Sequence, residues 1–149
     1  MPWTVEAVRP SDLPAVLALL AHVQLPVTGV AEQFPDYMAV RDEDRLIGVC
    51  GLEVHGDDAL LRGVAVDPQY RGFGVAGALV EQALRRARER GLREVYLLTT
   101  TAQEYFRQRG FAACTREEAP EAIRTSWEFR VGCPDTSALM KRATASSAQ

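Results

Sequence analysis

The chain opens with a period-two pattern that then changes to a helical period. Trp3, Val5 and Ala7 alternate with polar neighbours, which predicts a half-buried strand. Over residues 13–20 the apolar positions recur three or four apart, and Ser11 stands where an N-cap belongs, so we expect an amphipathic helix there. Residues 23–35 contain prolines and a glycine without a regular period, which predicts a long loop. Loops of this length often carry function.

Three apolar runs follow, separated by short charged or glycine-containing turns. They cover residues 37–41, 46–54 and 60–66, and this spacing predicts three antiparallel strands in a meander. Residues 76–87 then show one apolar and one charged helical face, which predicts a long amphipathic helix. Gly91 follows at the position expected for a C-terminal cap.

The last third of the chain predicts shorter elements. Residues 94–98 form a buried strand pattern, and Thr101 and Glu104 have the spacing of a capping box that opens a short helix ending at Gly110. Residues 120–130 fit a helix or a strand equally well, and residues 137–142 predict a last strand. The order predicts an α/β (α+β mixed) fold, with a mixed, mostly antiparallel sheet flanked by helices. We expect one domain over residues 1–142 and a disordered tail over 143–149.

Charge and composition exclude several classes of protein. With 17 basic and 20 acidic residues the formal charge is −3, which argues against nucleic acid or an anionic membrane as a partner. Apolar runs are too short to cross a bilayer, and no secretory signal pattern is present, so we expect a cytoplasmic protein. Three widely separated cysteines, Cys50, Cys114 and Cys133, predict structural thiols and neither a disulfide nor a metal site.

The segment with the clearest chemistry is a strand that runs through a turn into glycines opening a helix. Unpaired amides at a helix N-terminus bind phosphate, Gly72 and Gly74 remove side chains that would keep the phosphate away, and Arg71 adds a cation. We therefore predict a pyrophosphate site over residues 69–77. Gly72, Gly74 and Gly77 also match the Gly-x-Gly-x-x-Gly spacing of dinucleotide-binding folds. Those folds place the motif in a strand-helix-strand unit, whereas here an antiparallel meander is predicted before it, so the match is weak evidence for a dinucleotide site.

Residues 69–74, Gln-Tyr-Arg-Gly-Phe-Gly, resemble the Gln/Arg-x-x-Gly-x-Gly/Ala acetyl-CoA motif of the GNAT superfamily. The resemblance implies a GNAT-like acyl-CoA N-acyltransferase fold, acetyl-CoA as co-substrate and no metal. It further implies that the pantetheine arm bonds the strand before the motif, and that this strand splays from residues 94–98. The implied cofactor-binding residues are Val64, Ala65, Val66, Gln69, Arg71, Gly72, Phe73, Gly74, Val75, Ala76 and Gly77.

A narrower resemblance covers most of the chain. Stretches such as residues 96–102, Tyr-Leu-Leu-Thr-Thr-Thr-Ala, are similar to small acetyltransferases associated with bacterial arsenic resistance and to the acetyltransferase domain of bacterial N-acetylglutamate synthase. This resemblance implies direct transfer, in a ternary complex, to the primary amine of a small amino-acid-like acceptor. Whether the chain forms a homodimer is left open.

Charged residues inside apolar strands are the acceptor-side candidates. Glu53 would be costly to bury without a partner and could serve as general base, although a solvent-facing position explains it equally well. Arg62 could bind an acceptor carboxylate or could be exposed, and Thr99 is assigned to the same site. Many GNAT enzymes have a tyrosine acid where this chain has Phe106. The adjacent Tyr105, which is about 100° away around the helix, and a water are the alternative candidates for the acid. A non-catalytic acyl-CoA sensor and a protein or peptide N-acetyltransferase remain alternatives.

Overall fold

The computed structural model describes residues 3–125 and 137–144. The chain divides into two compact units, one built from Met1–Glu53 and Leu61–Arg85, and the other from Val54–Leu60 and Arg86–Gln149. Strands β3 and β4 and helix α2 run from one unit into the other, and each unit is described by itself below.

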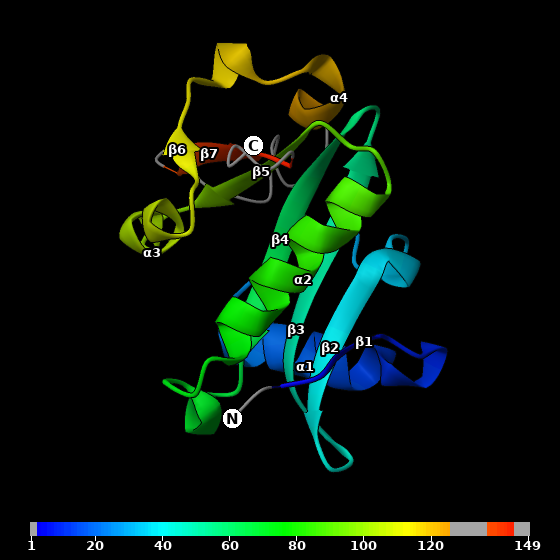
Figure 1. The fold of residues 1–149 in the computed structure, drawn as a ribbon. Helices are drawn as coiled ribbons and strands as arrows, with labels where there is room; N and C mark the ends of the chain where they lie inside the picture. Colours follow the sequence, from blue (N-terminus) through cyan, green and yellow to red (C-terminus); the bar gives the residue numbers. More distant parts are fainter. Residues whose placement is uncertain (1–2, 126–136, 145–149) are drawn as a thin grey trace. The chain divides into compact units, whose positions relative to one another are not determined.

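The strands form a seven-stranded sheet in the order β1-β2-β3-β4-β5-β7-β6 (Figure 1). Strands β4 and β5 pair in parallel, whereas β1 with β2, β2 with β3, β5 with β7 and β6 with β7 pair antiparallel, which confirms the predicted mixed, mostly antiparallel α/β class. The strands are β1 Val5–Ala7, β2 Tyr37–Asp42, β3 Arg45–His55, β4 Asp58–Val66, β5 Glu94–Thr99, β6 Ala112–Ala113 and β7 Ala138–Ala143. The helices are α1 Leu13–His22, α2 Val75–Glu89, α3 Gln103–Gln108 and α4 Glu121–Arg124, with 3₁₀ turns η1 Pro10–Asp12, η2 Phe34–Asp36, η3 Pro68–Tyr70 and η4 Arg116–Glu118.

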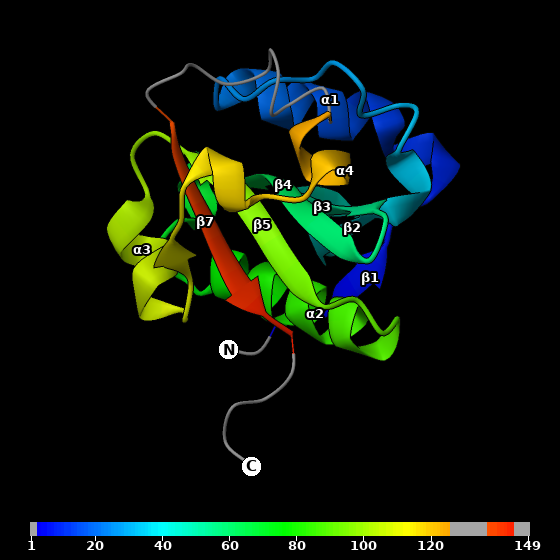
Figure 2. The ribbon, with the colours of Figure 1, turned by 90° about the horizontal axis from the view of Figure 1, so that it is seen from above.

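In the first unit, α1 and the start of α2 lie on opposite faces of strands β2 to β4 (Figure 2). The face toward α1 carries a core that includes Leu20, Tyr37 and Val49. On the other face Gly48 meets α2, and a Cβ built there would lie 2.6 Å from Cγ1 of Val75. Glycine at this position therefore lets the first turn of α2 rest directly against the sheet.

In the second unit, β5 and β7 pair along their whole length, from Glu94 opposite Ala143 to Thr99 opposite Ala138. Helix α4 lies over these strands (Figure 2), and its Ile123 is fully buried in a cluster with Tyr96 and Leu98. The ambiguous segment 120–130 is thus helical over Glu121–Arg124, and its residues 126–130 lie outside the described part.

The predicted N-cap of the first helix is wrong. Asp12, and not Ser11, is the N-cap of α1, because residues 10–12 form the 3₁₀ turn η1. The Asp12 carboxylate accepts a hydrogen bond from the Arg9 amide at 2.7 Å and another from the Arg41 guanidinium of β2. This ion pair joins the start of α1 to the sheet.

The predicted capping box at Thr101 and Glu104 is also wrong. Helix α3 has Ala102 as its N-cap with no side-chain cap, and the Ala102 amide instead donates to the Thr99 hydroxyl at 3.0 Å. At the C-terminal end, β7 includes Ala143, one residue into the predicted tail, and residues 145–149 lie outside the described part. No helix of the described residues has the length and apolar character to span a membrane.

Candidate functional site

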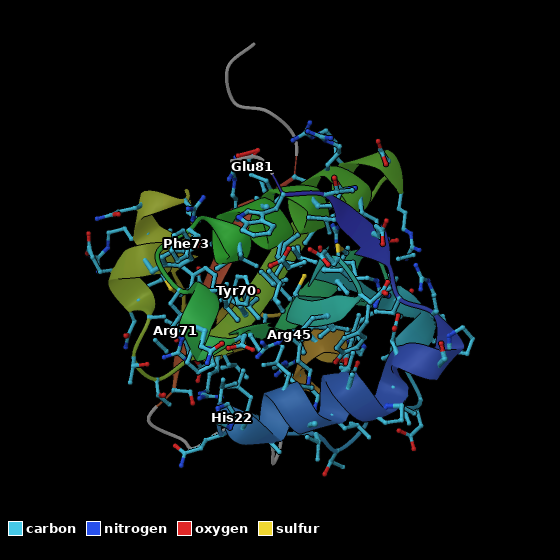
Figure 3. The ribbon with its side chains drawn as sticks, turned by 90° about the horizontal axis from the view of Figure 1, so that it is seen from below. His22, Arg45, Tyr70, Arg71, Phe73 and Glu81 are labelled. Carbon is cyan, nitrogen blue, oxygen red and sulfur yellow. The ribbon has the colours of Figure 1, made fainter. Side chains whose placement is uncertain are left out.

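The turn between β4 and α2 is braced by charged residues of the first unit. Asp67 directly follows β4 and accepts a hydrogen bond from the Gln69 amide at 2.9 Å, while Arg45 of β3 donates to its other oxygen at 2.7 Å. The Gln69 amide and, to a lesser extent, Arg45 hold the pKa of Asp67 below its ordinary value. Figure 3 shows Tyr70, Arg71 and Phe73 along this turn, with Arg45 beside Tyr70. The turn is therefore tied to the β2–β3 hairpin.

The glycines of the turn adopt the geometry that an anion site requires. Gly72 and Gly74 have φ angles of 86° and 85°, in the region that favours glycine, and a Cβ at either would meet nothing within 4 Å. Helix α2 begins immediately afterwards, and within the described chain the amides of residues 74–77 donate to no backbone acceptor. Four such amides in a row, with the positive end of the helix dipole, form a site for phosphate oxygens.

The side chains around this turn are exposed or line an open hollow. Arg71 is exposed and, among the described residues, forms no ion pair, so its guanidinium remains available to an anion. Gln69, Gly72 and Phe73 line an open hollow of about 520 Å³ together with Trp3 and Tyr70. Phe73 is 62% exposed. The assignment of these residues to cofactor binding stays a prediction.

Two residues of this site were not predicted from the sequence. The indole Nε1 of Trp3 donates to the Phe73 carbonyl at 2.7 Å, and its ring packs edge to face against Tyr70 at 6.2 Å. The Tyr70 hydroxyl donates to Asp42 at 2.6 Å. These contacts link positions far apart in the sequence, so no local pattern indicates them.

The strand before the turn is partly enclosed. Ala65 and Val66 are buried and Val64 is half-buried, while Gly63 has a φ angle of 65° in the interior of β4. A glycine in that conformation is typical of a bulge that interrupts a strand, a signal that sequence analysis had available and missed. The predicted splay would involve β4 and β5 from the two units, and it stays a prediction.

Glu53 and Arg62, chosen separately from the sequence, form a buried ion pair. Only 4% of each residue is exposed, which rules out the solvent-facing alternatives. The Nη1 atom of Arg62 donates to the Glu53 carboxylate at 3.1 Å, and the Tyr37 hydroxyl donates to the same oxygen at 3.3 Å. The two charges therefore compensate each other inside the protein.

The same arginine reaches the long loop over residues 23–35. The Nη2 atom of Arg62 donates to the Thr28 carbonyl. Gly29 follows with a φ angle of 84°, and a Cβ there would lie 3.3 Å from Nη1 of Arg62. The loop therefore lies against the ion pair at a point where glycine permits the close approach.

In the second unit, Tyr105 and Phe106 have different surroundings. Phe106 is buried and packs edge to face against Phe111 at 5.6 Å. The Tyr105 hydroxyl is enclosed and makes no hydrogen bond with the described residues, and Arg109 lies over its ring at 4.7 Å. Thr99, assigned to the acceptor site, accepts the bond from the Ala102 amide described above.

The thiols and possible metal ligands form no cluster in the described part of the chain. Cys50 is buried and its thiol lies 3.8 Å from the Leu79 carbonyl. Burial raises the pKa of the Cys114 thiol, which makes it a poor nucleophile at neutral pH. Cys133 lies outside the described residues.

A curated protein with a known activity is similar in sequence to most of this chain. An amino-acid acetyltransferase of Mannheimia succiniciproducens is 24% identical over 132 residues, which are 87% of this chain and 29% of that protein. The chain thus spans less than a third of this curated relative.

Solved structures share the fold. An N-acetylglutamate synthase from Neisseria gonorrhoeae, complexed with coenzyme A and N-acetyl-glutamate, is 20% identical with a TM-score of 0.87, over 98% of this chain and 36% of that one. The ribosomal-protein-S18-alanine N-acetyltransferase from Escherichia coli is 21% identical with a TM-score of 0.74, over 99% and 97%. The sequence profile of the acetyltransferase (GNAT) family matches residues 12–111, which is more than half of the chain. The chain therefore belongs to the GNAT acetyltransferase family.

Proposed function

We propose that this chain is an acetyl-CoA-dependent N-acetyltransferase that acts on the primary amine of a small amino-acid-like acceptor. The observation that carries the proposal is the buried ion pair of Glu53 and Arg62 against the loop over residues 23–35. Its partners all lie in the unit that contains the glycine turn, so one unit combines an anion site with a buried carboxylate.

The cofactor half of the site follows from the turn. The amides of residues 74–77 and the Arg71 guanidinium bind the pyrophosphate of acetyl-CoA, and the backbone of Val64, Ala65 and Val66 bonds the pantetheine arm. Acetyl-CoA supplies the activated acetyl group as a thioester. The remaining task of the protein is to orient the amine and to move two protons.

Glu53 is the group that accepts the proton from the attacking amine, directly or through one water. As the carbon–nitrogen bond forms and the carbon–sulfur bond breaks, the proton of the amine passes to the Glu53 carboxylate. Arg62 holds that carboxylate in place through its ion pair and, in this proposal, also lies beside the carboxylate of an amino-acid-like acceptor. Thr99 is the weaker acceptor-side candidate because its hydroxyl already accepts a hydrogen bond from the Ala102 amide.

Tyr105 is the proposed acid for the departing thiolate of CoA. Its enclosed hydroxyl has a proton to donate and no partner among the described residues, and buried polar groups of this kind usually have a partner in the working state. The Phe106 side chain cannot take this role because it carries no proton donor. We expect Tyr105→Phe to lower kcat at saturating acceptor.

A second function, a non-catalytic acyl-CoA sensor, is favoured by one observation. The position at which many family members carry the tyrosine acid is filled here by Phe106, which packs into the core. In that case acetyl-CoA would raise the unfolding temperature and no amine would be acetylated.

Mass-spectrometric detection of product separates these functions. The protein is incubated with acetyl-CoA and a panel of amino acids, amino-acid analogues, polyamines and peptides. Acetylation of free amino-acid-like amines supports the proposal, acetylation of peptides alone indicates a protein N-acetyltransferase, and binding without product supports the sensor.

Two variants test the assigned residues. Glu53→Gln should lower kcat/KM by about 10²- to 10⁴-fold, the usual contribution of a general base, while the exposed control Glu89→Gln should leave it unchanged. Full turnover of Glu53→Gln across pH would eliminate the proposed base. Gly74→Glu places an anionic side chain in the open space beside the amides, and unchanged affinity for CoA in that variant would exclude the pyrophosphate assignment.

A further inference from the structure

Trp3 contacts the glycine turn through one directed bond. Its indole Nε1 donates to the Phe73 carbonyl at 2.7 Å, although 70 positions separate the two residues in the chain. Trp3 itself is half-buried and lies just before β1. The bond therefore connects the N-terminal edge of the sheet to the turn that precedes α2.

The hydrogen bond from Trp3 to the Phe73 carbonyl also sets the direction of the Gly74 N–H, because both groups belong to one planar peptide. The structure contains no cis peptide among its described residues, so the Phe73 carbonyl and the Gly74 N–H point in opposite directions across one planar unit. An indole that binds the carbonyl on one side consequently directs the Gly74 N–H to the other side. That N–H is the first of the four amides, residues 74–77, that have no backbone acceptor.

The orientation of the Phe73–Gly74 peptide plane needs a restraint because glycines stand at positions 72 and 74. Gly72 and Gly74 both have positive φ angles, and no atom lies within 4 Å of where their side chains would be. Glycine rotates about its backbone bonds with little steric restriction, so packing alone does not fix this peptide plane. Loss of the indole bond would allow the plane to rotate.

The indole is held in turn by a short chain of contacts. Trp3 packs edge to face on Tyr70, the Tyr70 hydroxyl donates to Asp42 at 2.6 Å, and the Arg45 guanidinium lies 5.9 Å above the Tyr70 ring. Figure 3 shows Arg45 and Tyr70 next to each other, with Phe73 further along the turn. Asp42 and Arg45 of the β2–β3 hairpin thus hold the Tyr70 ring, and this ring packs against Trp3.

We propose that Trp3 is a positioning residue for the pyrophosphate of the cofactor: its N–H fixes the Phe73–Gly74 peptide so that the Gly74 amide faces the phosphate oxygens. This inference deepens the proposed function and rests on it. Trp3 touches no reacting atom and acts only through the peptide that it binds. Its contribution should therefore appear in cofactor affinity and not in the transfer step.

The test compares Trp3→Phe with the wild-type protein on two acetyl donors. Trp3→Phe keeps an aromatic ring against Tyr70 and removes the N–H. Acetyl-CoA contains the pyrophosphate, whereas acetyl-pantetheine carries the same thioester without it. We expect Trp3→Phe to raise the KM for acetyl-CoA and the Kd for CoA by about fivefold, the effect of one ordinary hydrogen bond, with kcat unchanged. The kcat/KM for acetyl-pantetheine should not change.

Each other outcome overturns the inference. An equal loss with both donors would mean that Trp3 stabilises the unit in general, and thermal unfolding of the variant would show the same. Unchanged KM for acetyl-CoA would mean that the indole bond does not order the amide. Wild-type protein that binds no CoA would refute the proposed function together with this inference, whereas wild-type binding with no change in Trp3→Phe refutes the inference alone.

Discussion

Removal of Arg62 should destabilise the protein much more than removal of an ordinary surface arginine. Arg62→Met preserves most of the length of the side chain but leaves the buried Glu53 carboxylate without its cation and the Thr28 carbonyl without this donor. Only 3% of the Arg62 side chain and 5% of the Glu53 side chain are exposed, so water cannot replace the lost contacts. Breaking a buried ion pair in this way costs about 3–5 kcal/mol of unfolding free energy.

A double-mutant cycle measures how much of this cost belongs to the pair. Glu53→Leu leaves the guanidinium buried without its carboxylate and should cost a similar amount. The double variant buries no uncompensated charge, so its unfolding free energy should exceed that of either single variant. The predicted coupling between the two positions is therefore at least about 2 kcal/mol.

Urea unfolding monitored by far-ultraviolet circular dichroism provides the measurement. For a urea m-value of about 2 kcal/mol/M, a loss of 3 kcal/mol lowers the midpoint by about 1.5 M, which is easily resolved. The m-values must agree among the four proteins for the cycle to be valid. Single costs that add to the double cost within about 0.5 kcal/mol would refute the ion pair as a coupled unit, and with it the placement of the base in the acceptor site.

Two further predictions follow from buried contacts of the first unit. Gly51→Ala should cost about 1–3 kcal/mol in urea unfolding, because its Cβ would lie 2.3 Å from Cζ of the buried Tyr37 ring; an unchanged midpoint would show that the ring moves freely. The hydrogen bond from Arg41 holds the pKa of Asp12 below its ordinary value. The ionised carboxylate therefore stabilises the fold at pH values above the unfolded pKa of about 3.9. This stabilisation is lost as the pH falls through the folded pKa. The difference in unfolding free energy between wild type and Asp12→Asn should therefore be largest near neutral pH and should shrink below about pH 4; a constant difference would contradict the linkage.

Local patterns in the sequence were sufficient for most of the helices and strands and for the glycine turn between β4 and α2. The glycines at 72 and 74 were predicted because the φ angles that they adopt, and the close approach of an anion, both favour glycine over other residues. One predicted boundary failed at a residue that has a distant partner: Asp12, and not Ser11, is the N-cap of α1, and its carboxylate pairs with Arg41 from β2. Propensity gives no information about such a partner.

The pairing of Glu53 with Arg62 could not be predicted from the sequence. Glu53 and Arg62 were each noticed as a charge inside an apolar strand, but the sequence does not give the register between β3 and β4 that brings them within 3.1 Å. The indole of Trp3 gave no signal, because its partner is a backbone carbonyl 70 positions away and any residue type provides one. A residue whose role is to bind a backbone atom is therefore found only in the structure. The residues of the glycine turn could therefore be chosen by type and spacing, whereas the contact that Trp3 makes with that turn could not.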